Sequence, residues 1–210
     1  MSLSSFAVWL AVLSVVVAPK GDDKPVYVPA NPPAEWTRTT TLPLNTRVLE
    51  YCRKNLGKTV GTGPTRGECA ELNGHALLSA GARARFAART DTGSRHDYVW
   101  GKLIATLTAG KVDASVVQPG DLLQIRGPRS GLSFRGPASN GGVYHGGYTQ
   151  HSAVVQAVGK TDESWWLMTY DQNLHGPSGK LERWVQEGTQ LKLRDLQEGT
   201  TIWVYRPVSR

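Results

Sequence analysis

The sequence predicts one domain of the α+β class, and two observations lead to this prediction. Helical patterns fill the first half of the foldable region, and patterns typical of β-strands fill the second half. Seven tryptophans and 23 glycines among 210 residues favour a fold rich in strands and loops over a helical bundle. Helices followed by strands indicate helices packed on an antiparallel sheet, and the length suits a single core.

Residues 1–18 are interpreted as a signal peptide or an N-terminal membrane anchor. Residues 6–17 (FAVWLAVLSVVV) form an apolar run that is well short of the roughly 20 residues that span a bilayer. Val16, Val17 and Ala18 offer a cleavage site, although no Lys or Arg precedes the run and a proline follows it. A buried N-terminal strand is the alternative. We therefore expect a secreted protein, or one in the periplasm or cell envelope.

Residues 19–44 are predicted to be an extended linker, because proline, threonine and charged residues occur there without a sustained apolar period. The folded domain would then cover residues 45–210. Asn45 or Thr46 could cap its first helix. The apolar face of this helix would be formed by Val48, Leu49, Cys52 and Leu56, and Gly57 would end the helix.

A glycine-rich loop, residues 58–68, leads into a second predicted helix, residues 69–80. The loop lacks the Gly-Lys-Ser/Thr ending of a phosphate-binding P-loop, so a nucleotide site is excluded. Cys69 would be the first helical residue, where unpaired N–H groups and the positive end of the helix dipole favour the thiolate. Gly81 is placed to end the helix.

Five strands are predicted from residue 121 onward by their β-branched and aromatic residues. They cover residues 121–125, 152–158, 165–170, 181–185 and 201–205. Short extended segments are expected at residues 98–101 and 103–105. Between the first two strands, residues 127–149 are predicted to be a long functional or mobile loop.

A catalytic triad can be assembled from Cys69 and three residues of the predicted sheet. His151 opens the strand at residues 152–158, and Asp171 and Asn173 follow the next strand. Alternation along a strand would put Asp171 and Asn173 on one face. Either could bind the far nitrogen of His151 and fix its tautomer, while Cys69 serves as nucleophile and His151 as general base and acid.

Five short motifs occur in a familiar order. They are Gly67-Glu68-Cys69, Val99-Trp100-Gly101, Pro119-Gly120-Asp121-Leu122-Leu123-Gln124, His151-x-Ala153-x-Val155 and Gln172-Asn173-x-x-Gly176. Their order resembles the papain-like NlpC/P60 and CHAP superfamily of cell-wall amidases and endopeptidases. The resemblance is closer, over residues 46–206, to the cysteine-proteinase-fold domain at the C-terminus of fungal actin-patch SH3 proteins. It implies a papain-like fold with the nucleophile-bearing helix packed on an antiparallel β-sheet.

The resemblance implies Cys69 as nucleophile, His151 as base and Asn173 or Asp171 as the orienting group. The predicted function is a secreted papain-like cysteine hydrolase that cleaves an amide bond in peptidoglycan or a peptide. The alternative is a catalytically inactive binding module of the same fold, in which a Cys52–Cys69 disulfide removes the nucleophile. The Cys69 N–H would supply part of the oxyanion hole. The sequence departs from the family here: papain-type enzymes often place a glutamine or tyrosine side chain upstream of the cysteine as a second donor, whereas this chain has Gly61, Thr62, Gly63, Thr65 and Arg66 there.

The formal charge of +7 and the isoelectric point near 9.6 favour an anionic cell-wall polymer or peptide as partner. Nucleic acid fits less well, because the basic residues are scattered and no nucleic-acid motif accompanies them. His145 and His151 lack zinc-ligand spacing, so no metal and no cofactor is expected. We expect a monomer that meets a membrane only through an uncleaved N-terminal segment.

Overall fold

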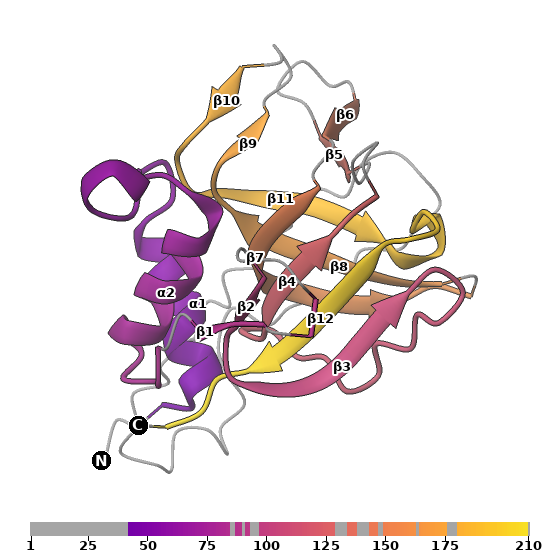
Figure 1. The fold of residues 1–210 in the computed structure, drawn as a ribbon, viewed down its shortest axis with the longest axis horizontal. Coiled ribbons are helices and arrows are strands. Elements are labelled where there is room, and N and C mark those ends of the chain that lie inside the picture. Colours follow the sequence, from indigo (N-terminus) through magenta and orange to yellow (C-terminus); the bar gives the residue numbers. More distant parts are fainter. Residues whose placement is uncertain are drawn as a thin grey trace, which may run out of the picture. The chain divides into compact units, whose positions relative to one another are not determined.

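A computed structural model describes residues 42–84, 87–89, 91–92, 97–128, 134–137, 143–146, 149–162, 164–175 and 180–209. In this region two helices lie side by side against a curved antiparallel sheet (Figure 1). The interpretations of residues 1–18 and of nearly all of the linker concern residues outside these ranges. Neither helix of the described region is long and apolar enough to cross a membrane.

Helix α1 covers Leu44–Lys54 and buries the predicted apolar face of Val48, Leu49 and Cys52. It begins after Pro43, so Asn45 is not its cap. The Asn45 side chain instead donates hydrogen bonds to the Pro119 carbonyl oxygen, at 3.0 Å, and to Asp121, at 2.9 Å. This side chain therefore ties α1 to the turn that enters the sheet.

Helix α2 covers Cys69–Ser79, close to the predicted range, and packs against α1 and the sheet. Gly81 ends it as predicted, with a φ of +71° that favours glycine. The Gly81 N–H donates to the Leu78 carbonyl and the Ala82 N–H to the Leu77 carbonyl, which is the Schellman pattern. A short 3₁₀ helix, η2 (Gly63–Thr65), lies in the glycine-rich loop before α2.

The main sheet of the described region has eight strands in the order β3-β12-β4-β7-β8-β11-β5-β6, and all neighbours are antiparallel. The strands are β3 (Lys102–Thr108), β4 (Leu122–Arg126), β5 (Phe134–Pro137), β6 (Val143–Gly146), β7 (Gln150–Lys160), β8 (Trp165–Asp171), β11 (Gln186–Lys192) and β12 (Thr201–Arg206). Two short pairs join β1 (Ala87–Ala88) to β2 (Tyr98–Val99) and β9 (Leu174–His175) to β10 (Leu181–Glu182). A second 3₁₀ helix, η3 (Leu193–Asp195), follows β11.

The sheet departs from the prediction in two places. The segment 181–185 is extended only over the two residues of β10, and β11 was not predicted, because its sequence QEGTQLK carries almost no β-branched or aromatic residue. The predicted loop, residues 127–149, contains the paired strands β5 and β6, and β5 also pairs with β11. The interpretation as one long loop is therefore wrong for these two segments.

Both faces of the sheet carry apolar side chains. Along β12, Trp203 and Tyr205 belong to the core beneath the helices, whereas Ile202 and Val204 belong to a second core on the other face. The alternation follows from the two-residue period of a strand. A sheet buried on both faces is rigid, and the ends of β7 and β8 are consequently fixed in position.

Candidate active site

Cys69 is the first residue of α2, as the sequence predicted. Glu68 precedes it in an extended conformation and makes no side-chain cap. The N–H groups of Cys69 and Ala70, at the very start of the helix, have no intrahelical acceptor. Gly67 has a φ of +90°, and a β-carbon there would lie 2.8 Å from the Arg183 β-carbon. Glycine at this position lets the chain turn into the helix against the segment that contains Arg183.

His151 and Asp171 form a buried hydrogen-bonded pair. The His151 Nε2 atom lies 2.8 Å from Asp171 Oδ1, and each side chain is only 1% exposed. The other carboxylate oxygen accepts a hydrogen bond of 2.5 Å from the Thr169 hydroxyl. Both carboxylate oxygens are therefore engaged, and the imidazole ring is held in one orientation.

Cys69 contacts this pair from the side of α2. Its thiol is hydrogen-bonded to the His151 side chain and to the backbone of Ser152. Because Asp171 engages Nε2, the ring nitrogen available to the thiol is Nδ1. The structure thus brings Cys69, His151 and Asp171 together in one chain of contacts.

Electrostatics in this cluster favour an ion pair. Burial acts to raise the pKa of the Cys69 thiol, but the hydrogen bond and charge of His151 and the Ser152 backbone bring it below its ordinary value. Burial acts to lower the pKa of His151, but the hydrogen bond that its ring donates to Asp171, followed by the contact with Cys69, raises it to about 9. This arrangement stabilises the thiolate and the imidazolium relative to an isolated thiol and imidazole.

Asn173, the other predicted orienting residue, lies elsewhere. Strand β8 ends at Asp171, and Asn173 has a φ of +67°, so the chain has turned out of the strand before it. The predicted alternation therefore does not extend to Asn173. Its side-chain amide donates instead to Glu68 Oε2, at 2.8 Å.

The predicted alternative of a Cys52–Cys69 disulfide is not formed, since both cysteines are free. Cys52 is fully buried in the core beneath the sheet. Burial, followed by the charge of Asp171, raises the pKa of its thiol to about 12. Cys52 is therefore a neutral core residue, and of the two thiols only that of Cys69 has a lowered pKa.

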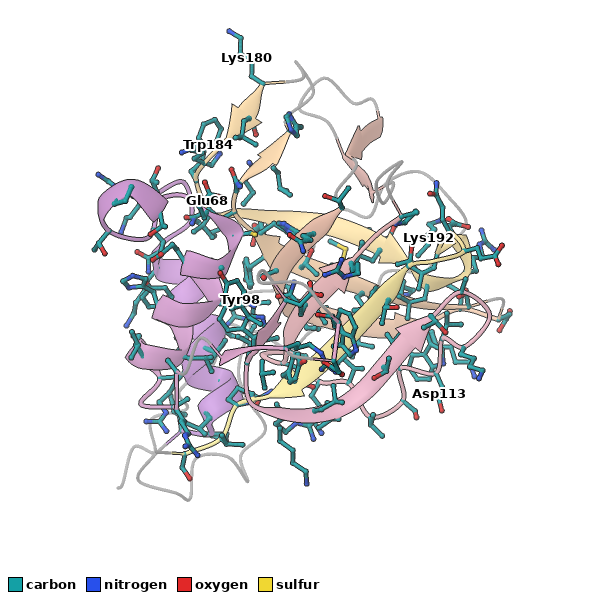
Figure 2. The ribbon with its side chains drawn as sticks, in the orientation of Figure 1. Glu68, Tyr98, Asp113, Lys180, Trp184 and Lys192 are labelled. Carbon is teal, nitrogen blue, oxygen red and sulfur yellow. The ribbon has the colours of Figure 1, made fainter. Side chains whose placement is uncertain are left out.

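Residues that sequence reasoning missed surround the cluster. Tyr98 lies between α2 and the sheet (Figure 2), and burial, followed by the charges of Cys69 and Glu71, raises the pKa of its hydroxyl. Gln124 is buried and accepts hydrogen bonds from the Tyr98 N–H, at 3.2 Å, and from the Ser152 hydroxyl, at 3.0 Å. Gln124 is the last residue of the Pro119–Gln124 motif, although no role could be assigned to it from the sequence. Tyr98 belongs to no motif, and nothing in its spacing from Cys69 indicates that the two residues are close.

In the segment upstream of Cys69, where papain-type enzymes often carry a second oxyanion donor, the Thr65 hydroxyl donates to Glu71 Oε1 at 2.7 Å. A β-carbon at Gly61 would lie 2.8 Å from Glu71 Cγ, so this glycine makes room for the Glu71 side chain. Both Thr65 and Gly61 of this loop therefore accommodate the Glu71 side chain.

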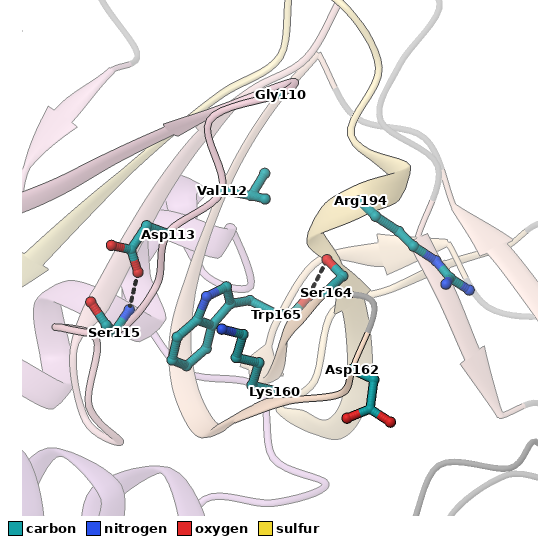
Figure 3. Close-up of a pocket in the computed structure, with 9 residues that line it drawn as sticks. All are labelled: Gly110, Val112, Asp113, Ser115, Lys160, Asp162, Ser164, Trp165 and Arg194. Atoms are coloured by element: carbon teal, nitrogen blue, oxygen red, sulfur yellow. Dashed lines mark hydrogen bonds between the residues drawn. The ribbon is translucent and has the colours of Figure 1, made fainter.

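A pocket of about 690 Å³ lies at the other end of β7 and β8 (Figure 3). It is lined by the connection between β3 and β4, by the turn between β7 and β8, and by Arg194 of η3. The Lys160 ammonium lies 5.4 Å from the centre of the Trp165 ring. Cys69, His151 and Asp171 do not line this pocket. In the described part of the chain, no group of three His, Cys, Asp or Glu side chains is arranged to hold a metal ion.

A cysteine at the start of a helix, packed on an antiparallel sheet that presents a histidine to it, defines a cysteine-proteinase fold. The chain belongs to the AIM3/BBC1 cysteine proteinase-fold domain family, whose family model matches residues 30–210. This confirms the resemblance to the fungal actin-patch domain and the α+β fold class predicted from the sequence. No curated protein and no solved structure matches the chain.

Proposed function

We propose that this chain is a cysteine hydrolase that cleaves an amide bond. Cys69 is the nucleophile, His151 is the general acid and base, and Asp171 orients His151. The supporting observation is the buried 2.8 Å contact between His151 Nε2 and Asp171, with the Cys69 thiol hydrogen-bonded to the same ring. A thiolate and an imidazolium in contact supply a nucleophile and an acid at the same pH.

The reaction begins when the Cys69 thiolate attacks the carbonyl carbon of the amide. The tetrahedral intermediate collapses as the C–N bond breaks, and the amine leaves with the proton that His151 donates. A thioester on Cys69 remains. Neutral His151 then removes a proton from water, the water oxygen attacks the thioester carbon, and the carboxylic acid is released as the thiolate forms again.

Stabilisation of the oxyanion comes from the start of α2. As the first helical residue, Cys69 has a backbone N–H without an intrahelical acceptor, and the positive end of the helix dipole lies at the same point. Donors aimed at developing charge are the largest single contribution in many acyl-transfer enzymes. The end of α2 that carries the nucleophile therefore also stabilises the intermediate.

We propose that the substrate is a peptide or an amide-bearing wall polymer with negative charge, met outside the cytoplasm. The net charge of +7 supports an anionic partner, and the apolar run at residues 6–17 supports export. Near the start of α2, Arg66 and Arg183 are exposed, and Arg183 lies 3.8 Å from Glu68. These guanidinium groups are suited to bind carboxylates of the substrate.

The test uses an activated ester, p-nitrophenyl acetate, and a library of peptide coumarylamides. We expect a burst of nitrophenol, a mass increase of one acetyl group on the peptide containing Cys69, and turnover of some of the amides. Cys69→Ala should abolish all three signals. Cys52→Ala is the matched control and should retain them, provided that circular dichroism shows a folded protein. Acetylation that persists in Cys69→Ala would refute the proposal.

A further inference from the structure

Gln172, which directly follows Asp171, has no part in the mechanism above, yet it is fully buried. Its side-chain oxygen accepts a hydrogen bond of 2.7 Å from the Val60 N–H. Its amide nitrogen donates to the Val60 carbonyl oxygen, at 3.2 Å, and to the Glu68 carbonyl oxygen, at 2.8 Å. One side chain thus binds both ends of the glycine-rich loop that leads to Cys69.

The loop is closed around this amide. The Gly67 N–H also donates to the Val60 carbonyl oxygen, at 2.8 Å, so the two ends of the loop are held by backbone and side chain together. Because Gln172 is buried, loss of its amide would leave polar backbone groups of Val60 and Glu68 without that partner. The Gln172 amide therefore helps to fix the path of the chain into α2, together with the N–H groups of Gly67 and Glu71, which donate to the Val60 and Glu68 carbonyl oxygens.

The bond to Glu68 has a particular consequence for the chemistry. The carbonyl of Glu68 and the N–H of Cys69 belong to the same peptide unit, which is planar and trans. A hydrogen bond that fixes the direction of the carbonyl consequently fixes the direction of the N–H. It also polarises the unit, because hydrogen bonds in a chain strengthen one another.

We propose that Gln172 is a positioning residue that fixes the Glu68–Cys69 peptide unit, so that the Cys69 N–H points at the oxyanion formed during attack. This inference rests on the proposed function. The end of β8 then supports three parts of the site with three successive residues. Asp171 orients the base, Gln172 orients the oxyanion donor, and Asn173 holds the Glu68 side chain.

Two reagents separate this role from a general structural one. Iodoacetamide alkylates the thiolate by displacing iodide and forms no oxyanion, whereas p-nitrophenyl acetate acylates it through a tetrahedral intermediate. Both rates are measured on the full chain for wild type, Gln172→Met and the matched control Gln156→Met. Gln156 makes its side-chain contacts with Tyr170 and Glu187, away from the loop before α2.

We expect Gln172→Met to acylate about ten- to a hundredfold more slowly while alkylation changes by less than about twofold. The loss is smaller than the 10²–10³ measured when an oxyanion donor is removed, because the N–H itself remains. Gln156→Met should match wild type in both rates. Equal changes of both rates in Gln172→Met, or no change in either, would overturn the role of Gln172.

Gln172→Glu provides a second variant if the methionine variant does not fold. It keeps the size of the side chain and the acceptor for Val60, but it loses the donor to Glu68. We expect the same selective loss of acylation at neutral pH, and unchanged acylation would overturn the proposal. Absence of any acylation in wild type would instead overturn the proposed acyl transfer, and with it the role of Gln172.

Discussion

Replacement of Asp171 by asparagine tests the electrostatic basis of the proposed site. The substitution keeps the shape of the side chain but removes the charge that contacts His151 Nε2 at 2.8 Å. Against the effect of burial, the hydrogen bond that His151 donates to Asp171 and the contact with Cys69 raise the pKa of His151 to about 9. Without the carboxylate, the imidazolium loses its partner, and the Cys69 thiolate in turn loses the cation that stabilises it.

The size of the effect follows from the thiolate population. If the pKa of Cys69 rises by about one to two units, the thiolate fraction at pH 6 falls about tenfold to a hundredfold. A more basic thiolate is also more nucleophilic, by about threefold per pKa unit. The alkylation rate at pH 6 should therefore fall about three- to tenfold. As the pH rises toward and past the thiol pKa of the variant, the difference between the two rates should shrink, and a fully ionised variant should react as fast as wild type or faster.

The assay is the rate of alkylation by iodoacetamide between pH 4 and 9.5, with the labelled peptide identified by mass. Asn173→Ala is the control, because Asn173 binds Glu68 rather than His151 and its removal should leave the profile within about twofold. Parallel profiles for wild type and Asp171→Asn would refute the reasoning. A low-pH loss in Asn173→Ala but not in Asp171→Asn would reverse the assignment of the orienting residue.

Further predictions concern pH and packing. Turnover should rise as Cys69 ionises, below the usual thiol range, and fall as His151 loses its proton near its pKa of about 9; a rate that rises only to a plateau near pH 8.5 would contradict the pair. Gly120 has a φ of +85°, and a β-carbon there would collide with the backbone oxygen of Asn45. Gly120→Ala should therefore lower the unfolding free energy, measured by urea denaturation, by at least about 2 kcal/mol. Gly110→Ala has a φ of +76° but open space, and its loss should be about 1 kcal/mol; equal losses would refute the steric argument. Leu77→Ala, fully buried, should cost about 3 kcal/mol, and Leu78→Ala, 45% exposed, below about 1 kcal/mol; similar melts for both would contradict the assigned helix face.

Local chemistry made much of the fold predictable. The start of α2 at Cys69 and its end at Gly81 follow from a glycine-rich entry, an apolar helical period and a C-terminal glycine. Strands such as β12 are dense in β-branched and aromatic residues. Strand β11 could not be predicted, because it joins the sheet through backbone hydrogen bonds to β8. Its polar side chains carry no signal of this pairing. The pairing of β5 with β6 could not be predicted either, because the surrounding sequence is rich in glycine, which is typical of loops.

The contact between Cys69 and His151 could be predicted from the sequence, but the residue that holds His151 depended on sheet register. Strand β7 pairs Val154 with Tyr170, and one further step along that register puts Asp171 opposite Ala153, diagonal to His151 on the same face. A continued strand would have put Asn173 directly opposite His151, which is the arrangement that alternation suggested. The position at which β8 ends decides whether Asp171 or Asn173 contacts His151. The ends of strands are the parts that sequence predicts least well.

The turn at Asn173 also explains why Gln172 could not be recognised. In a continued strand, Gln172 would face away from Asp171 and from the base, as an ordinary polar residue. Because β8 stops, the Gln172 amide reaches Val60 and Glu68, which lie more than 100 positions earlier in the chain. A contact of this separation has no local signature, since the partner groups are backbone atoms that any residue carries. The candidate nucleophile can therefore be predicted from the sequence, whereas the contacts proposed to position its N–H can be identified only in the folded chain.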